Sequence, residues 1–157
     1  MSINIPTILE GLASTAKTIE AFKNWKRATA RDVWKLIEEL ESNSLHCWTV
    51  LDKNESVGNI VNKLSTAEYD RLRRESFDFN NIRQKKVYPY KSLGGTDLAF
   101  LGEKETKALI TNIYERIKDL KNKYPFAEDG TQKRWYTRVE NIQKRILLLL
   151  RHVRAQA

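Results

Sequence analysis

The sequence has little cysteine and histidine, few glycines and prolines, and no long apolar run. Cys47 is the only cysteine, so no internal disulfide can form. His46 and His152 are the only histidines, which excludes a conventional Cys/His zinc site. Six Gly and three Pro argue against a β-sandwich, which needs many tight turns. The longest apolar run, Ile146–Leu150, is far shorter than the roughly 20 residues of a membrane span. We therefore expect no metal, no other cofactor and no membrane span.

The charge of the chain is high and unevenly distributed. Charged residues make up 31% of the 157 residues, hydrophobic residues 41%, and the formal net charge is +8. Residues 1–80 hold 11 Lys and Arg against 12 Asp and Glu, whereas residues 81–157 hold 17 against 8. Such an asymmetry points to a polyanionic partner, of which DNA or RNA is the first candidate. Since Glu10, Lys17 and Glu20 interrupt any signal-peptide pattern, we expect a cytoplasmic protein.

Apolar residues recur with helical periodicity over most of the chain. The spacing predicts helices over about 7–25, 29–51, 66–75, 103–123 and 131–157. We expect an all-α fold, a compact bundle of about five main helices in a single domain, 1–157. Its parts would be a near-neutral helical half (1–76), a long loop (77–101) and a basic helical hairpin (103–157). A capping box at Ser65–Glu68 marks the start of one helix, and Glu38, Glu39 and Glu41 should lie on the exposed side of another.

Residues 77–101 interrupt the helical pattern with a basic and aromatic loop. Its cations are Arg83, Lys85, Lys86 and Lys91, its aromatics include Tyr88 and Tyr90, and no acid occurs between Asp78 and Asp97. Cations that follow phosphates and rings that stack on bases are the usual combination for binding single strands. Aromatics in a long loop also serve to pin it to the domain, which we favour for Phe77, Phe79 and Phe100. For Tyr88 and Tyr90 both roles stay open.

The last predicted helix, 131–157, combines an apolar stripe with a cationic flank. The stripe consists of Trp135, Val139, Ile142, Ile146, Leu149 and Val153. Arg134, Arg138 and Arg145 follow its edge and are candidates for phosphate contacts, because guanidinium groups bind phosphate bidentately. Leu147, Leu148 and Leu150 make the helix apolar nearly all round. Such a helix is either central to the bundle, which we favour, or part of an interface.

Arg145 and His152 form an Arg-x6-His spacing on this helix. Two turns separate them, so both lie on one face, about 10.5 Å apart along the axis. The spacing resembles the Arg-x4–6-His motif of the HEPN superfamily, over residues 145–152 alone. The resemblance implies metal-independent RNA cleavage, usually across a homodimer interface. His152 would move a proton and Arg145 would stabilise phosphorane charge.

These patterns predict a non-enzymatic helical accessory or adaptor protein. It would bind a protein partner or a second copy of itself, and DNA or RNA through its basic C-terminal half. The alternative is a HEPN-like ribonuclease that uses Arg145 and His152. No serine, cysteine or paired-carboxylate pattern offers another catalytic site.

Overall fold

The computed structural model describes residues 4–127 and 132–154, and over these residues the predicted all-α fold is confirmed. The α-helices are α1 (Thr15–Arg27), α2 (Trp34–Lys53), α3 (Val57–Ile60), α4 (Ala67–Arg74), α5 (Thr106–Lys123) and α6 (Gln132–Arg154). Short 3₁₀ helices span Thr7–Leu12, Arg31–Val33, Phe79–Asn81, Lys91–Leu93, Ala99–Leu101 and Tyr124–Phe126. No helix among the described residues is long and apolar enough to cross a membrane.

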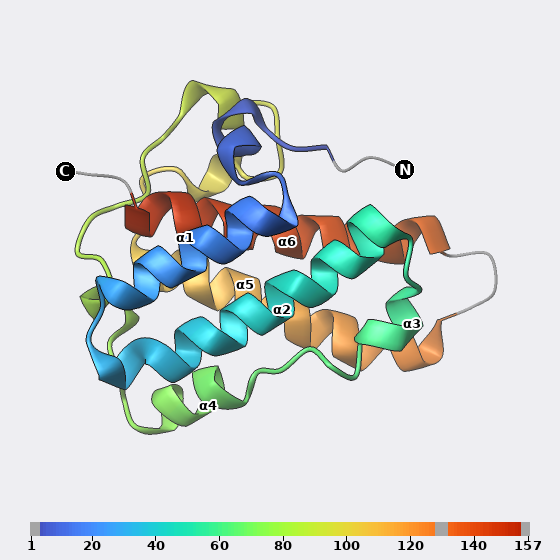
Figure 1. Ribbon diagram of the computed structural model, residues 1–157, viewed down its shortest axis with the longest axis horizontal. Helices are drawn as coiled ribbons and strands as arrows, with labels where there is room; N and C mark the ends of the chain where they lie inside the picture. Colours follow the sequence, from blue (N-terminus) through green and yellow to red (C-terminus); the bar gives the residue numbers. More distant parts are fainter. Residues whose placement is uncertain (1–3, 128–131, 155–157) are drawn as a thin grey trace.

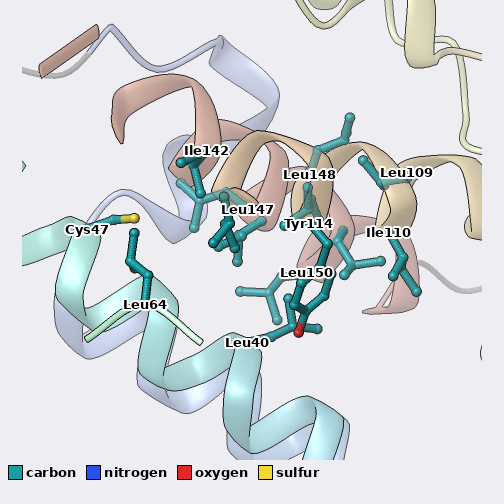
Figure 2. Close-up of a cluster of buried hydrophobic side chains, with 14 of the residues drawn as sticks. Leu40, Cys47, Leu64, Leu109, Ile110, Tyr114, Ile142, Leu147, Leu148 and Leu150 are labelled. Carbon is teal, nitrogen blue, oxygen red and sulfur yellow. The ribbon is translucent and has the colours of Figure 1, made fainter. Parts of the chain in front are cut away.

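The centre of the bundle is α6, which packs against α1, α2 and α5 (Figure 1). Every residue from Ile142 to Leu150 is buried. Figure 2 shows Leu147, Leu148 and Leu150 among side chains from the surrounding helices. Central burial therefore accounts for the apolar circumference of this helix. Each fully buried leucine contributes about 1.5–3 kcal/mol relative to an exposed one.

The first predicted helix, from Thr7 to Trp25, is wrong as one continuous element. A 3₁₀ helix ends at Leu12 and α1 begins at Thr15, because Ser14 adopts an extended conformation and its hydroxyl accepts the Lys17 amide (3.2 Å). The break changes which residues face the core. Ala16 is exposed, whereas Thr18 is buried and bridges two segments: its hydroxyl donates to the Leu12 carbonyl and accepts from the Trp48 indole, both at 3.0 Å.

The start of α4 is stabilised by α2 rather than by a local capping box. Glu39, predicted on an exposed face, is only 8% exposed. Its carboxylate accepts the Ser65 hydroxyl and the Glu68 amide, both at 2.8 Å, the Tyr69 amide at 3.3 Å and the Tyr114 hydroxyl at 2.9 Å. A carboxylate at the positive end of a helix is also favoured electrostatically. The predicted reciprocal Ser65–Glu68 bonds are therefore wrong, although a helix does start here.

The connection between α5 and α6 falls partly outside the described residues. The predicted turn at Asp129–Gly130 and the predicted cap at Thr131 lie there. The other end of α5 differs from the prediction: the helix begins at Thr106 rather than Glu103, since Glu103 has a positive φ of 66° and Glu105 is extended.

Candidate functional site

The 77–101 segment is irregular but firmly attached to the start of α5. Asn80 accepts the Lys107 amide (2.8 Å) with its side-chain oxygen and donates to Glu105 (2.7 Å) with its side-chain nitrogen. The Thr106 hydroxyl donates to the Arg83 carbonyl (2.6 Å). Phe79 is buried and Phe77 packs edge-on against it, as a pinning role predicts, whereas Phe100 is 50% exposed. These contacts fix the path of the segment before it reaches the C-terminal end of α6 (Figure 1).

Val87 anchors the most basic part of the segment. Its amide donates to the Lys104 carbonyl (2.8 Å), its carbonyl accepts the Glu103 amide (2.7 Å), and its side chain is buried. The next residue, Tyr88, is 64% exposed, while Tyr90 is half-buried and packs against the core. The centroids of the two rings are 4.8 Å apart, and the ring planes are inclined at 56° to each other. Tyr90 therefore pins the segment, and Tyr88 is held at the surface by a buried neighbour on one side and Pro89 on the other.

A pocket of about 590 Å³ lies between this segment and the C-terminal end of α6. Its lining consists of Arg83, Lys85, Lys86, Val87, Tyr88, Tyr90, Leu148, Arg151, His152 and Arg154. Five of these residues are Lys or Arg, and no Asp or Glu among the described residues lines the pocket. Val87 and Leu148 supply buried apolar surface. The described lining of the pocket is thus cationic and partly apolar, without a carboxylate side chain.

His152 forms part of the pocket wall and is only 6% exposed. Its Nε2 lies 2.7 Å from the Thr106 hydroxyl oxygen. Because that hydroxyl donates its single hydrogen to the Arg83 carbonyl, it must accept from His152, which assigns the hydrogen to Nε2. Burial, helped by the nearby charge of Arg83, lowers the pKa of His152 to about 4. The imidazole is therefore neutral at pH 7 and holds the basic segment against α6.

Arg145 lies in a different place and is fully buried. Its guanidinium donates to Asn112 (2.7 Å), to the Asp97 carboxylate (3.0 Å) and to the Asn141 carbonyl (2.9 Å). Lys144 contacts the same carboxylate at 3.0 Å. Burial alone would raise the pKa of Asp97, but its hydrogen bonds to the two cations lower it. Arg145 therefore supports the fold from within and has no surface to offer a phosphate.

The structure separates the other predicted cations from the pocket. Arg134 is exposed near the opposite end of α6, roughly 25 Å from Arg151 by helical rise. Arg138 pairs with Asp119 (2.6 Å) and covers the Trp135 ring. Lys91 is exposed at the start of a 3₁₀ helix but does not line the pocket. Of the predicted set, the pocket unites Arg83, Lys85, Lys86, Tyr88 and Tyr90.

Two cations of the pocket, Arg151 and Arg154, were absent from the candidates drawn from the sequence. They lie in the last turn of α6, three residues apart and therefore on one face. Their spacing is visible in the sequence, but their proximity to residues 83–90 depends on the tertiary fold. Conversely, Arg145 and His152 were predicted to form one site, but only His152 lines the pocket.

Comparisons with known proteins give no match: no family model, curated protein or solved structure is significantly similar to this chain.

Proposed function

We propose that the protein is a non-enzymatic helical binding module for nucleic acid, with the pocket between residues 83–90 and the end of α6 as its binding site. The observation that carries this proposal is the convergence of five cations around one pocket whose described lining contains no carboxylate. They come from two segments that are far apart in sequence, residues 83–86 and residues 151–154. Phosphate groups would offset the mutual repulsion of these charges.

Several cations elsewhere in the fold differ from this group because they form salt bridges with carboxylates of the chain. Lys118 pairs with Asp70, Arg138 with Asp119, and Lys144 and Arg145 with Asp97. In contrast, no salt bridge among the described residues joins Lys85, Lys86, Arg151 or Arg154 to a carboxylate. The described residues therefore supply acids for many internal cations, but none for Lys85, Lys86, Arg151 or Arg154, which we propose bind an external anion.

The geometry favours binding over the ribonuclease alternative. His152 is buried, neutral at pH 7 and bonded to Thr106 through one ring nitrogen. Arg145 is committed to Asp97, Asn112 and a backbone carbonyl. Neither side chain is arranged to act on an incoming phosphodiester as the resemblance to HEPN proteins implies.

An adaptor role also requires a protein partner or a second copy of the chain, which stays a prediction. The tryptophans, which suggested an interface, mostly serve the core. Trp25, Trp48 and Trp135 are buried, and Trp34 is half-buried beneath Lys26 and Arg31.

The test is binding of labelled oligonucleotides, single- and double-stranded, across a salt series in EDTA. We expect steeply salt-dependent binding of intact RNA or DNA. Lys85→Glu/Lys86→Glu should weaken binding at least about tenfold at low salt, since two charge-assisted contacts are lost. It should also make the slope of log affinity against log salt shallower by about 1.4, from about 0.7 per phosphate of a single strand.

The matched control is Lys17→Glu/Lys23→Glu, which makes the same change in net charge at exposed positions of α1. Equal loss of affinity in both double variants would show that net charge alone drives binding. Cleavage of the RNA that disappears in His152→Ala would restore the ribonuclease hypothesis.

A further inference from the structure

We infer that the pocket takes a single strand, with an unpaired base stacked on Tyr88 and the flanking phosphates held by cations from both walls. This inference rests on the proposed function and specifies the ligand of the same site. It depends on the size of the pocket, the presentation of Tyr88 and the distribution of charge around it.

The size of the pocket suits a short stretch of one strand. A volume of about 590 Å³ falls within the roughly 300–1,000 Å³ of sites that enclose small molecules. A duplex has its bases stacked inside and presents mainly its backbone and groove edges to a protein. A concave site of this size therefore fits an unstacked nucleotide better than the outer surface of a double helix.

Tyr88 is presented in the way that a stacking residue requires. The ring is 64% exposed, yet the backbone around it is fixed by the hydrogen bonds of Val87 and by the bond from the Tyr90 amide to the Tyr88 carbonyl (2.9 Å). The half-buried Tyr90 ring supports it from one side. An exposed aromatic that is held in place before binding loses little conformational freedom when a base stacks on it.

The cations surround this ring from two directions. Lys85 and Lys86 precede it on the loop wall, and Arg151 and Arg154 form the helix wall. The Nε of Arg151 is buried and has no hydrogen-bond partner among the described residues. Phosphates on either side of a stacked base would meet a cation on each wall, while Val87 and Leu148 provide apolar surface for the sugar and base.

The experiment measures, by anisotropy at low salt, binding of fluorescent octamers of uridine as single strands and of a G·C-rich hairpin as the duplex, because eight A·U pairs would not stay paired at low salt. An octamer that carries abasic sites throughout keeps the phosphates but removes the bases, and a deoxy version distinguishes RNA from DNA. We expect the single strand to bind at least about tenfold more tightly than the duplex, in either sugar form, and the abasic strand to bind weakly.

Variants at Tyr88 test the stacking directly. Tyr88→Ala should lose about 5- to 150-fold in affinity for the single strand, whereas Tyr88→Phe should retain it, because the ring rather than the hydroxyl stacks. A 2-aminopurine base in the strand should be quenched on binding to the native protein and to Tyr88→Phe, but not to Tyr88→Ala. Thermal unfolding of each variant should be close to that of the native protein, since the ring is mostly exposed.

The possible failures are distinguishable. Equal binding of duplex, single and abasic strands, unchanged in Tyr88→Ala but lost in Lys85→Glu/Lys86→Glu, would overturn the stacking inference and leave the proposed function intact. A native protein that binds no oligonucleotide at low salt would overturn both.

Discussion

The Asp97 cluster and the pocket are two cationic regions of opposite character. In the first, Lys144 and Arg145 are buried and both contact one carboxylate. In the second, at the end of the same helix, Arg151 and Arg154 face a cavity without carboxylates in its described lining. Fewer than ten residues of α6 separate Arg145, which pairs with a carboxylate of the chain, from Arg151, for which no salt bridge is found among the described residues. The role of each cation on this basic helix therefore depends on the groups that its side chain contacts.

The largest expected effect is a loss of stability when the carboxylate of the Asp97 cluster is removed. Asp97→Ala leaves the fully buried Arg145 without its carboxylate and should destabilise the protein by about 3 kcal/mol, the lower end of the range for buried pairs because Asp97 itself is 37% exposed. Urea denaturation measures this loss. Glu20→Ala, at an exposed acid on α1, is the control and should change the free energy of unfolding by less than about 0.5 kcal/mol. A loss below about 1 kcal/mol in Asp97→Ala would mean that the cluster is structurally dispensable.

The second-largest expected effect is a pH dependence of stability caused by His152, which forms part of the pocket wall. In the unfolded chain His152 takes up a proton near pH 6.5, but burial lowers the pKa in the folded protein to about 4. The unfolded state therefore binds more protons between these values, and stability should fall as the pH is lowered through this window, by up to about 3 kcal/mol. Denaturation midpoints at pH 7, 5.5 and 4.5 test this.

His152→Gln should remove most of this dependence, and His46→Gln measures the contribution of the other histidine. Asp97 cannot mimic the effect. Its pKa is lowered in the folded protein, so the stability that it contributes is present above about pH 3.8 and is lost only below that value. A dependence that persists undiminished in His152→Gln would show that other ionisable groups cause it and that burial of His152 does not.

The smallest expected effect is a change in single-strand affinity, tested by substitutions at the two ends of α6. Arg151→Ala should weaken single-strand binding on the order of threefold to tenfold and reduce the salt slope by about 0.7, as the loss of one phosphate contact does. Arg134→Ala, at the exposed opposite end, should change affinity less than about twofold. Equal effects would indicate that the whole cationic flank of α6 binds nucleic acid, as the sequence alone predicts.

The sequence predicts the fold class correctly because the periodicity of apolar residues is a strong local signal. It also predicts a basic and aromatic loop over residues 77–101, since a run without acids is visible before folding, and part of this loop lines the pocket. The sequence does not predict which side chains pair with residues far away in the chain. The same cationic flank includes Arg145, which folding buries against Asp97, and Arg134, which folding leaves exposed. Likewise Glu39 appears solvent-facing until helix α4 is placed over it.

Glu39 also determines how the molecule should open. One carboxylate in α2 accepts hydrogen bonds from the first amides of α4 and from a tyrosine of α5. The helix α4 is too short to be stable alone, so its amides can be released only when these bonds break. Amide hydrogen exchange at Glu68 and Tyr69 should then report the opening of three helices as one cooperative unit rather than the fraying of a single short turn.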